Sequence, residues 1–312
     1  SHLKDSGAEI LYGDDPTKLF RARKNETEIK GAHQAHERDG VAMVRFLRWL
    51  DETAPIEPLT ELNISEKIEE MRRKSDQFRD LSFPTIAGAG PHGAIVHYQA
   101  TPQSNRQLDQ NSLLLLDSGA QYPDGTTDIT RTLPIGKPSK DMQRHFTLVL
   151  KGHIAIASAR FPVGTNGGQL DALARQHLWR AGLNYDHGTG HGVGSYLGVH
   201  EGPHRLAAGS TVPFEAGMIV SNEPGLYLQD QYGIRIENLL VVTKSDTGES
   251  FLEFDPLTLV PIDRRLILVD LLDDQERTWM DAYHKRIYDT LTDQLDSPDR
   301  EWLATMCKPL QR

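Results

Sequence analysis

Four carboxylates and one histidine constrain the possible fold of this chain more than any other feature. Each of them lies near the end of a strand-like run or in a glycine-rich turn. They are Asp117, Asp128, His191, Glu223 and Glu237. Any one of them alone is explained as an ordinary turn or loop residue. Together they combine hard oxygen donors with one borderline nitrogen, a set that suits two divalent ions of the manganese, cobalt or zinc kind. We therefore predict a metal centre that holds two ions.

The spacing of the four carboxylates also predicts a fold. Asp117 and Asp128 lie eleven residues apart near the ends of two candidate strands. Glu223 and Glu237 lie fourteen residues apart in the same way. Candidate helices precede each pair. We therefore expect an α+β fold of two halves, related by a pseudo-two-fold axis with the metal at its centre.

Hydrophobic periodicity predicts the elements that carry these pairs. Apolar residues at three- and four-residue steps predict helices over residues 25–52, 60–78, 139–160 and 168–181, and a last helix that Asp273 opens. The expected N-caps are Asn25, Thr60 or Ser65, and Ser139. Apolar runs between Gly, Pro and polar turns predict strands over residues 85–90, 94–98, 112–117, 126–132, 218–222 and 234–242.

Composition argues against several classes of protein. The 312 residues suffice for one large domain or two ordinary ones, and no apolar run approaches the roughly 20 residues that cross a bilayer. The net charge is −10 without a basic stripe, so we expect no nucleic acid and no membrane among the partners. The single cysteine, Cys307, excludes an internal disulfide. Together with the lack of a signal-peptide pattern, it predicts a cytoplasmic protein.

A pair of bridged divalent ions indicates hydrolysis. Carboxylate bridges hold two such ions about 3.5 to 4 Å apart, and a water between them becomes a hydroxide nucleophile near neutral pH. Cleavage of an amide also needs oxyanion stabilisation and a proton for the leaving nitrogen, which suits His97, His187 and His200. Each of these histidines is alternatively a loop or core residue. Glu223 is a candidate to take the proton of the water, and Arg235 either orients a carboxylate or neutralises the acidic cluster.

Motifs for other chemistries are missing from the sequence. The glycine-rich stretch 188–192 lacks the Gly-Lys-Ser/Thr ending of a P-loop. Pro91 would spoil the helix turn that a dinucleotide-binding fingerprint at residues 88–93 requires. The nucleophile-elbow pattern G-x-S-x-G does not occur.

The segments around the candidate ligands resemble one known family. The ligand order with its flanks, and the stretches 187–195 and 199–203, are similar to the pita-bread metallopeptidases, which include methionine aminopeptidase, prolidase and aminopeptidase P. The tail, with residues 256–261, Trp279, Tyr283 and His284, is similar to the long, cytosolic-type aminopeptidase P. The resemblance implies a pita-bread catalytic domain over residues 1–245 and a docked C-terminal extension over 246–312. By the same resemblance, we expect the N-terminal domains of the long form to be absent from this chain.

The resemblance also implies an activity and a ligand scheme. The enzyme would remove the first residue of a peptide whose second residue is proline, and it would form a homodimer. Its cofactor would be two manganese ions, with cobalt or zinc left open. Asp117 would hold one ion, and Asp128 and Glu237 would bridge the pair. His191 and Glu223 would hold the other ion.

Further roles follow from the same resemblance. Glu223 would be the general base, and His97 and His200 would steady the substrate and the tetrahedral intermediate. The residues implied on the proline side are His187, Arg235 and Tyr227.

Two other functions stay open for this sequence. A prolidase would act on Xaa-Pro dipeptides instead of longer peptides. A pita-bread domain that only binds peptides is the second alternative, although such modules usually lose ligands, and here the set of five is intact. The intact set also disfavours a metal-free creatinase-like hydrolase, and the tail disfavours methionine aminopeptidase.

Overall fold

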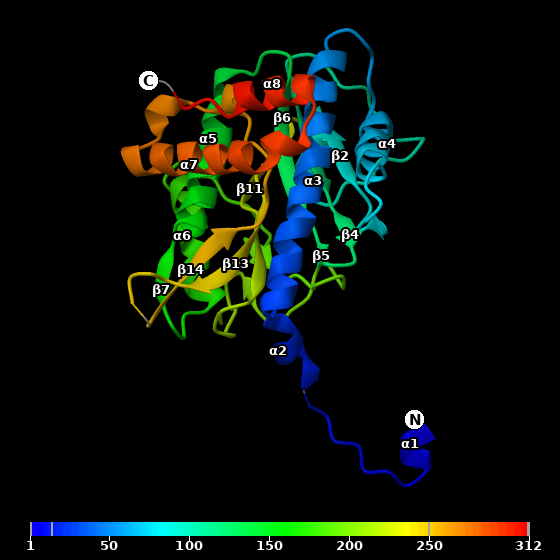
Figure 1. The fold of residues 1–312 in the computed structure, drawn as a ribbon, viewed down its shortest axis with the longest axis vertical. Helices are drawn as coiled ribbons and strands as arrows, with labels where there is room; N and C mark the ends of the chain where they lie inside the picture. The colour runs from blue at the N-terminus through cyan, green and yellow to red at the C-terminus, as the bar shows by residue number, and fades with distance from the viewer. Residues whose placement is uncertain (1, 14, 249, 311–312) are drawn as a thin grey trace.

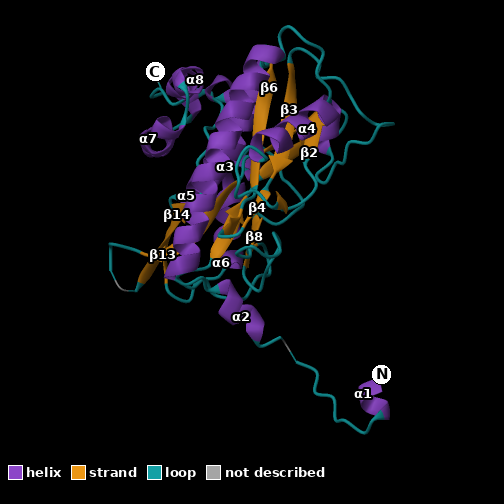
Figure 2. Ribbon diagram, turned by 45° about the vertical axis from the view of Figure 1, so that its right-hand side comes forward, coloured by secondary structure: helices purple, strands orange, loops and turns teal. Residues whose placement is uncertain are grey.

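The long helix α3 (Glu26–Thr53) runs beside both groups of strands and joins the two halves of the molecule (Figure 1 and Figure 2). In the computed structural model, which describes residues 2–13, 15–248 and 250–310, Phe46 and Leu50 of α3 pack against strands of the first half. Ala32 of the same helix packs against strands of the second half. The N-terminal arm, with α1 (His2–Asp5) and α2 (Thr17–Ala22), extends away from the body in both views.

The first half is built around the antiparallel sheet β2–β3–β6. Its strands are β2 (Ile86–Ala89), β3 (Ser112–Ser118) and β6 (Ile129–Ile135). Their buried apolar side chains pack against α3 and α4 (Glu61–Arg72). The 3₁₀ helix η1 (Gly90–Ala94) follows β2. A small sheet consists of β1 (Asp80–Leu81), β4 (Ala120–Tyr122) and β5 (Gly125–Thr126).

The second half is built around a four-stranded antiparallel sheet in the order β10–β13–β14–β7. These strands are β7 (Arg160–Pro162), β10 (Ile219–Asn222), β13 (Asn238–Lys244) and β14 (Phe251–Pro256). Helices α5 (Lys140–Ala157) and α6 (Gly167–Trp179) pack on each other and on this sheet. Two short hairpin-like pairs complete the half: β8 (Gly190–His191) with β9 (Arg205–Leu206), and β11 (Gly225–Leu228) with β12 (Tyr232–Arg235).

The C-terminal segment folds back onto the body. It contains η2 (Arg264–Leu266), η3 (Val269–Leu271), α7 (Asp274–Leu291), η4 (Thr292–Gln294) and α8 (Ser297–Met306). Met280 and Leu303 of this segment share one buried cluster with Phe146 of α5 and Ile234 of β12. The segment is therefore part of the same core. A domain boundary at residue 245 stays a prediction, and the outermost residues of the two predicted ranges, 1 and 311–312, lie outside the described residues.

Local capping signals placed the helix starts correctly. The side chains of Asn25, Thr60, Ser139 and Asp273 each accept a hydrogen bond from the backbone N–H three residues further on. Helix α6 is followed by Gly182, whose φ of 71° suits a C-terminal turn that glycine adopts without strain. The strands predicted over 112–117 and 218–222 form as well, the second one residue shorter. Of the described helices, none has both the length and the apolarity to cross a bilayer.

Two predicted elements end early or split. The helix predicted over residues 60–78 ends at Arg72, directly after Met71, the last buried apolar residue of its stripe. The strand predicted over 126–132 is two strands, since β5 ends at Thr126 and β6 begins at Ile129. Asp128 lies in the gap between them.

Two further strand predictions were wrong for a reason that lies outside the local sequence. Residues 94–98 form no strand: η1 ends at Ala94, and a turn follows in which Val96 lines a cavity instead of a sheet. The strand predicted over 234–242 is split into β12 and β13. At the break, the N–H groups of Ile236 and Glu237 bond to Pro224 O and Thr130 O, so the backbone leaves one strand pair and joins another.

Candidate metal centre and active site

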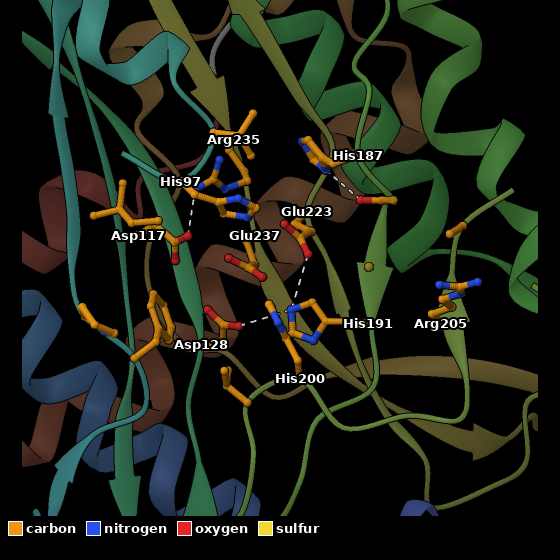
Figure 3. Close-up of a pocket in the computed structure, with 18 of the residues that line it drawn as sticks. His97, Asp117, Asp128, His187, His191, His200, Arg205, Glu223, Arg235 and Glu237 are labelled. Carbon is orange, nitrogen blue, oxygen red and sulfur yellow. Dashed lines mark hydrogen bonds and ion pairs between the residues drawn. The ribbon is translucent and has the colours of Figure 1, made fainter. Parts of the chain in front are cut away.

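The five predicted ligands converge from both halves of the fold. Asp117 lies in β3, and Asp128 lies directly before β6. Glu223 follows β10, Glu237 lies between β12 and β13, and His191 belongs to β8. In the view of Figure 3, Asp117 and Asp128 lie on one side of Glu237, and Glu223 and His191 lie on the other.

The ligand atoms face a common centre. One oxygen each of Asp128 and Glu237 and one nitrogen of His191 lie within 4.8 Å of one another. His191 Nε2 lies 3.5 Å from Asp128 Oδ2 and 3.4 Å from Glu223 Oε1. These distances are long for direct hydrogen bonds but leave the space that a shared cation between the donors needs.

Neighbouring side chains fix the orientation of two carboxylates. Arg235 Nη2 donates to Asp117 Oδ2 at 2.7 Å, and Arg235 Nε donates to Thr130 Oγ1 at 3.0 Å. The Thr130 hydroxyl in turn donates to Glu237 Oε2 at 2.7 Å. Arg235 therefore orients a carboxylate, one of the two roles that the sequence left open. Partners of this kind hold metal ligands in place and tune their basicity.

The electrostatics of the cluster favour added positive charge. Burial raises the pKa of Asp117 to about 7. Burial and the negative charges of Asp128 and Glu223 raise the pKa of Glu237 well above its usual range. Burial alone would lower the pKa of His191, but the nearby Asp128 and Glu223 raise it to about 9. The crowded carboxylates thus favour protonation, and bound divalent cations would neutralise the same negative charge.

One buried oxygen gives a second indication of fit. Asp117 Oδ1 is buried and has no hydrogen-bond partner among the described residues, whereas its Oδ2 accepts from Arg235. An unpaired buried carboxylate oxygen costs free energy unless a cation or donor meets it. The donor set, the raised pKa values and this free oxygen all fit divalent ions at the centre.

A cavity of about 480 Å³ adjoins the five ligands. His97, His187 and His200 line it, as the sequence predicted for a site around the metal (Figure 3). The ring centroid of His200 lies 4.1 Å from that of His191, edge-on. Burial lowers the pKa of His187 and of His200, which favours their neutral forms. The apolar part of the wall consists of Phe83, Pro84, Ile86, Val96 and Val199.

Tyr227 is not among the described residues that line the cavity, but it contacts two that do, His187 and Arg235. Arg235 Nη1 donates to the Tyr227 hydroxyl at 2.7 Å, so this hydroxyl is free to donate to His187 Nε2 at 2.8 Å. His187 Nδ1 then donates to Gly188 O at 2.7 Å. The chain of bonds fixes one neutral tautomer of His187 and links it to the guanidinium that holds Asp117.

Sequence reasoning missed three residues of this site. Thr130 follows Asp128 at the two-residue period of a strand, and this spacing was the available signal. Ser221 accepts from the His191 N–H at 2.9 Å and donates to Glu223 Oε1 at 3.2 Å, a contact between distant segments that spacing does not reveal. Arg205 lines the cavity beside the three histidines.

Comparison with known proteins agrees with this geometry. The model of metallopeptidase family M24 matches residues 30–244, and the model of the C-terminal region of peptidase M24 matches residues 250–310. The protein named aminopeptidase P1 from Lotus japonicus is 43% identical over 330 residues, which cover 96% of this chain and 50% of that protein. The chain spans about half the length of the curated relatives it matches.

Two solved structures have the same architecture. X-prolyl aminopeptidase from Caenorhabditis elegans, described as a cytosolic enzyme with a di-nuclear active site, has a TM-score of 0.92 and 41% identity, covering 95% of this chain and 50% of that one. Xaa-Pro dipeptidase from Bacillus anthracis has a TM-score of 0.72 and 29% identity, covering 84% of this chain and 69% of that one. The predicted α+β, pita-bread fold is thereby confirmed. Because the family model covers most of the chain and includes all five candidate ligands, the chain belongs to metallopeptidase family M24.

Proposed function

We propose that this chain is the catalytic part of an Xaa-Pro aminopeptidase, which hydrolyses the first peptide bond of a substrate whose second residue is proline. The observation that carries the proposal is the convergence of five metal-type ligands and three further histidines on one cavity. The similarity to proteins named aminopeptidase P and X-prolyl aminopeptidase supports the specificity for proline.

The five ligands are proposed to hold two divalent ions. In this scheme Asp117 would hold one ion, His191 and Glu223 would hold the other, and Asp128 and Glu237 would contribute to both. Manganese is the ion we propose, because an oxygen-rich set suits it, with cobalt and zinc as alternatives. When bound, such a pair supplies Lewis acidity and lowers the pKa of coordinated water toward neutrality.

The protein's own side chains supply proton transfer and hydrogen bonds. Glu223 lines the cavity and is the proposed general base, which takes a proton from the attacking water and returns it to the prolyl nitrogen as that nitrogen leaves. His97 and His200 face the same cavity (Figure 3). In its neutral form each ring keeps one N–H, which is proposed to donate to the oxygen on which negative charge develops.

The proline side of the site is proposed to be the wall that His187 and Arg235 form, with Tyr227 bonded to both. Their hydrogen-bonded chain makes this wall rigid, since each polar tip is held by the next. Apolar side chains such as Ile86 and Val96 line the same cavity, and a pyrrolidine ring needs apolar contacts of this kind.

Partner and compartment are proposed from the resemblance. We infer that the chain forms a homodimer through its C-terminal extension. We also infer that it acts in the cytoplasm, because the Caenorhabditis elegans relative is described as cytosolic. Light scattering on the intact chain tests the first point: a mass of two chains is expected, and a monomer contradicts it.

The activity is tested by mass spectrometry of products after incubation with manganese-loaded protein. The substrate pair is an Arg-Pro-Pro peptide and its Arg-Ala-Pro counterpart. Loss of the first residue from the Arg-Pro-Pro peptide alone is expected. Equal cleavage of both peptides contradicts specificity for proline. If neither is cleaved, the same assay on a chain as long as the relatives decides between a requirement for further domains and a domain that only binds peptides.

A prolidase is the second candidate, because the chain also superposes on an Xaa-Pro dipeptidase with a TM-score of 0.72. The lower identity of 29%, against 43% for aminopeptidase P1, favours the aminopeptidase. An Xaa-Pro dipeptide offered beside an Xaa-Pro-Pro tripeptide separates the two. Preference for the dipeptide would replace the proposed function with prolidase activity.

A further inference from the structure

Arg131 is a fully buried guanidinium that lies between the proposed metal ligands and the C-terminal segment. It belongs to β6, whose side chains alternate in direction, so Thr130 and Thr132 point to one face and Arg131 to the other. The threonines bond to Glu237 and to the backbone of Arg235. Arg131 therefore contacts the same 235–238 segment from the opposite face of β6.

The hydrogen bonds of Arg131 divide between two partners. On the site side, Nη1 donates to Glu237 O at 2.7 Å and to Thr130 O at 3.0 Å, and Nη2 donates to Asn238 Oδ1 at 2.8 Å. The acceptors on the other side all belong to the C-terminal segment. They are Val260 O at 2.7 Å, Pro261 O at 3.1 Å and the Tyr283 hydroxyl at 3.1 Å. No acidic side chain among the described residues pairs with this cation, so carbonyl, amide and hydroxyl oxygens hold it alone.

Glu237 is thus held at both ends. Its carboxylate accepts from Thr130 Oγ1 on the cavity side, and its carbonyl oxygen accepts from Arg131. Its N–H donates to Thr130 O at 3.1 Å. Because this residue lies in the break between β12 and β13, it has no partner strand of its own, and these bonds replace the ladder that would otherwise fix its backbone.

Tyr283 is the point at which helix α7 enters this network. Its ring stacks on Trp279 with centroids 5.1 Å apart and planes 12° apart, and the residue is buried. Its hydroxyl lies 3.2 Å from Asn238 Oδ1 and 3.0 Å from Val260 O, within hydrogen-bond distance of both. Asn238 directly follows Glu237, so the hydroxyl of Tyr283 reaches within one residue of a proposed metal ligand.

We propose that the C-terminal extension is part of the metal centre: Arg131 and Tyr283 are positioning residues that hold the backbone of Glu237 in the place its carboxylate needs to bridge the ions. If Glu237 were flexible, its backbone would have to become ordered each time the metal binds. The lost conformational entropy would lower the affinity for the metal. The inference rests on the proposed metal centre, and metal affinity, not peptidase activity, is the quantity that tests it.

The test titrates Mn²⁺ into metal-stripped protein and follows free Mn²⁺ by electron paramagnetic resonance. Tyr283→Phe removes one hydroxyl and keeps the stacked ring, and it should weaken the binding of Mn²⁺ by on the order of 10-fold, within the range for groups that orient metal ligands. Tyr288→Phe is the matched control on the same helix, because its hydroxyl makes no hydrogen bond to any described residue. It should bind Mn²⁺ as the unsubstituted chain does.

Arg131→Lys is the second variant, and it should weaken Mn²⁺ binding more, since lysine cannot span acceptors on both sides. If Tyr283→Phe and Arg131→Lys lower the melting temperature of the metal-free protein but bind Mn²⁺ as tightly as the unsubstituted chain, their role is only structural and the proposal is overturned. If the unsubstituted chain itself binds no Mn²⁺, the metal centre fails and this inference falls with it. These two failures are distinguishable in one titration series.

Discussion

At the scale of single residues, the chemistry of the site depends on charge balance. Four carboxylates share a small space with Arg235, which is itself nearly buried and pairs with Asp117. Burial and then the neighbouring negative charges raise the pKa values of Asp117 and Glu237, and the negative charges of Asp128 and Glu223 raise that of His191 against the effect of burial. A chain that keeps so costly a cluster is suited to binding cations, because bound cations remove the repulsion between its carboxylates.

Asp128→Asn tests the bridge between the two ions. The change removes one negative charge and one donor oxygen but keeps the size of the side chain. Turnover should fall by more than the roughly 10–100-fold that substitutions beside metal ligands cost, and bound manganese should fall with it. Far-ultraviolet circular dichroism should stay unchanged. Asp76→Asn, at an exposed position after α4, is the control, and near-normal turnover in Asp128→Asn would rule out a bridge there.

His200→Ala separates a catalytic role from a ligand role. His200 lies against His191 and lines the cavity. Its loss should lower kcat by roughly 100- to 10,000-fold, the range for a group that stabilises charge or transfers a proton, while manganese content stays near two ions per chain. His33→Ala, outside the cavity on α3, should change neither quantity. Loss of manganese in His200→Ala would mean that His200 is a ligand.

At the scale of elements, the sequence predicted the features that interactions between neighbouring residues determine. The starts of α3, α4, α5 and α7 follow from one capping residue each, since the cap bonds to an N–H only three residues away. The position of the five candidate ligands near strand ends and turns was predictable for a similar reason. Glycine-rich turns and strand ends next to acidic residues are local patterns, and each can be recognised within a few neighbouring residues of the chain.

Elements decided by distant contacts could not be predicted in this way. The apolar residues 94–98 match the pattern of a strand, yet the close approach of Gly93 to Gly233 makes this segment part of the cavity wall. A Cβ built on Gly233 would lie 1.7 Å from Gly93 O, so position 233 requires glycine. The break at Ile236 and Glu237 depends on bonds to Pro224 and Thr130, which neither local pattern nor period encodes.

Helix α4 holds the segment that carries His97 through one buried carboxylate. Glu61 is fully buried and accepts four hydrogen bonds. The Ala89 N–H and His92 Nδ1 bond to Oε1, both at 2.8 Å. The Tyr98 hydroxyl at 2.8 Å and the Arg106 N–H at 2.9 Å bond to Oε2. Ala89 and Tyr98 bracket the turn with His97, so Glu61 fixes both ends of that turn.

Glu61→Gln should therefore affect both stability and turnover. The amide keeps one oxygen acceptor but presents an NH₂ group to two donors, so the free energy of unfolding should fall by about 1.5–3 kcal/mol. Because the turn with His97 loosens, kcat should fall while manganese binding stays unchanged. Denaturant unfolding and steady-state kinetics measure the two effects. Glu66→Gln, exposed on the same helix, is the control, and equal behaviour of the two variants would show that Glu61 does not hold this turn.

At the scale of the whole molecule, both halves and the C-terminal segment contain buried histidines that the active site does not use. Burial lowers the pKa of His36 in α3 to about 4 and that of His284 in α7 to about 3. His36 Nδ1 lies 2.7 Å from Ala32 O, and His36 Nε2 is buried without a partner in the described part of the chain. A second proton would lie on His36 Nε2, which has no acceptor in the described part of the chain, or on His284 Nε2, which already accepts from the Ile262 N–H at 3.1 Å. The folded state therefore favours the neutral form of both rings.

This dependence predicts loss of stability in mild acid. Below pH 6.5, the ordinary pKa of histidine, these two histidines become protonated in the unfolded chain. In the folded chain they become protonated only when the pH falls to about 3 to 4. These histidines therefore do not affect the free energy of unfolding above pH 6.5, and they lower it as the pH drops below 6.5, by up to about 1.4 kcal/mol per pH unit for each histidine.

His36→Gln should reduce the loss in unfolding free energy between pH 6.5 and 5.5 by about 1 kcal/mol, measured by denaturant unfolding of metal-free protein. His33→Gln, on the same helix, is the matched substitution control. The comparison cancels the titration of the proposed metal ligands, because they are common to both variants. An equal loss in His36→Gln and in the unsubstituted chain would mean that His36 accepts its proton in the folded state, and that the core around α3 opens in acid more easily than its packing implies.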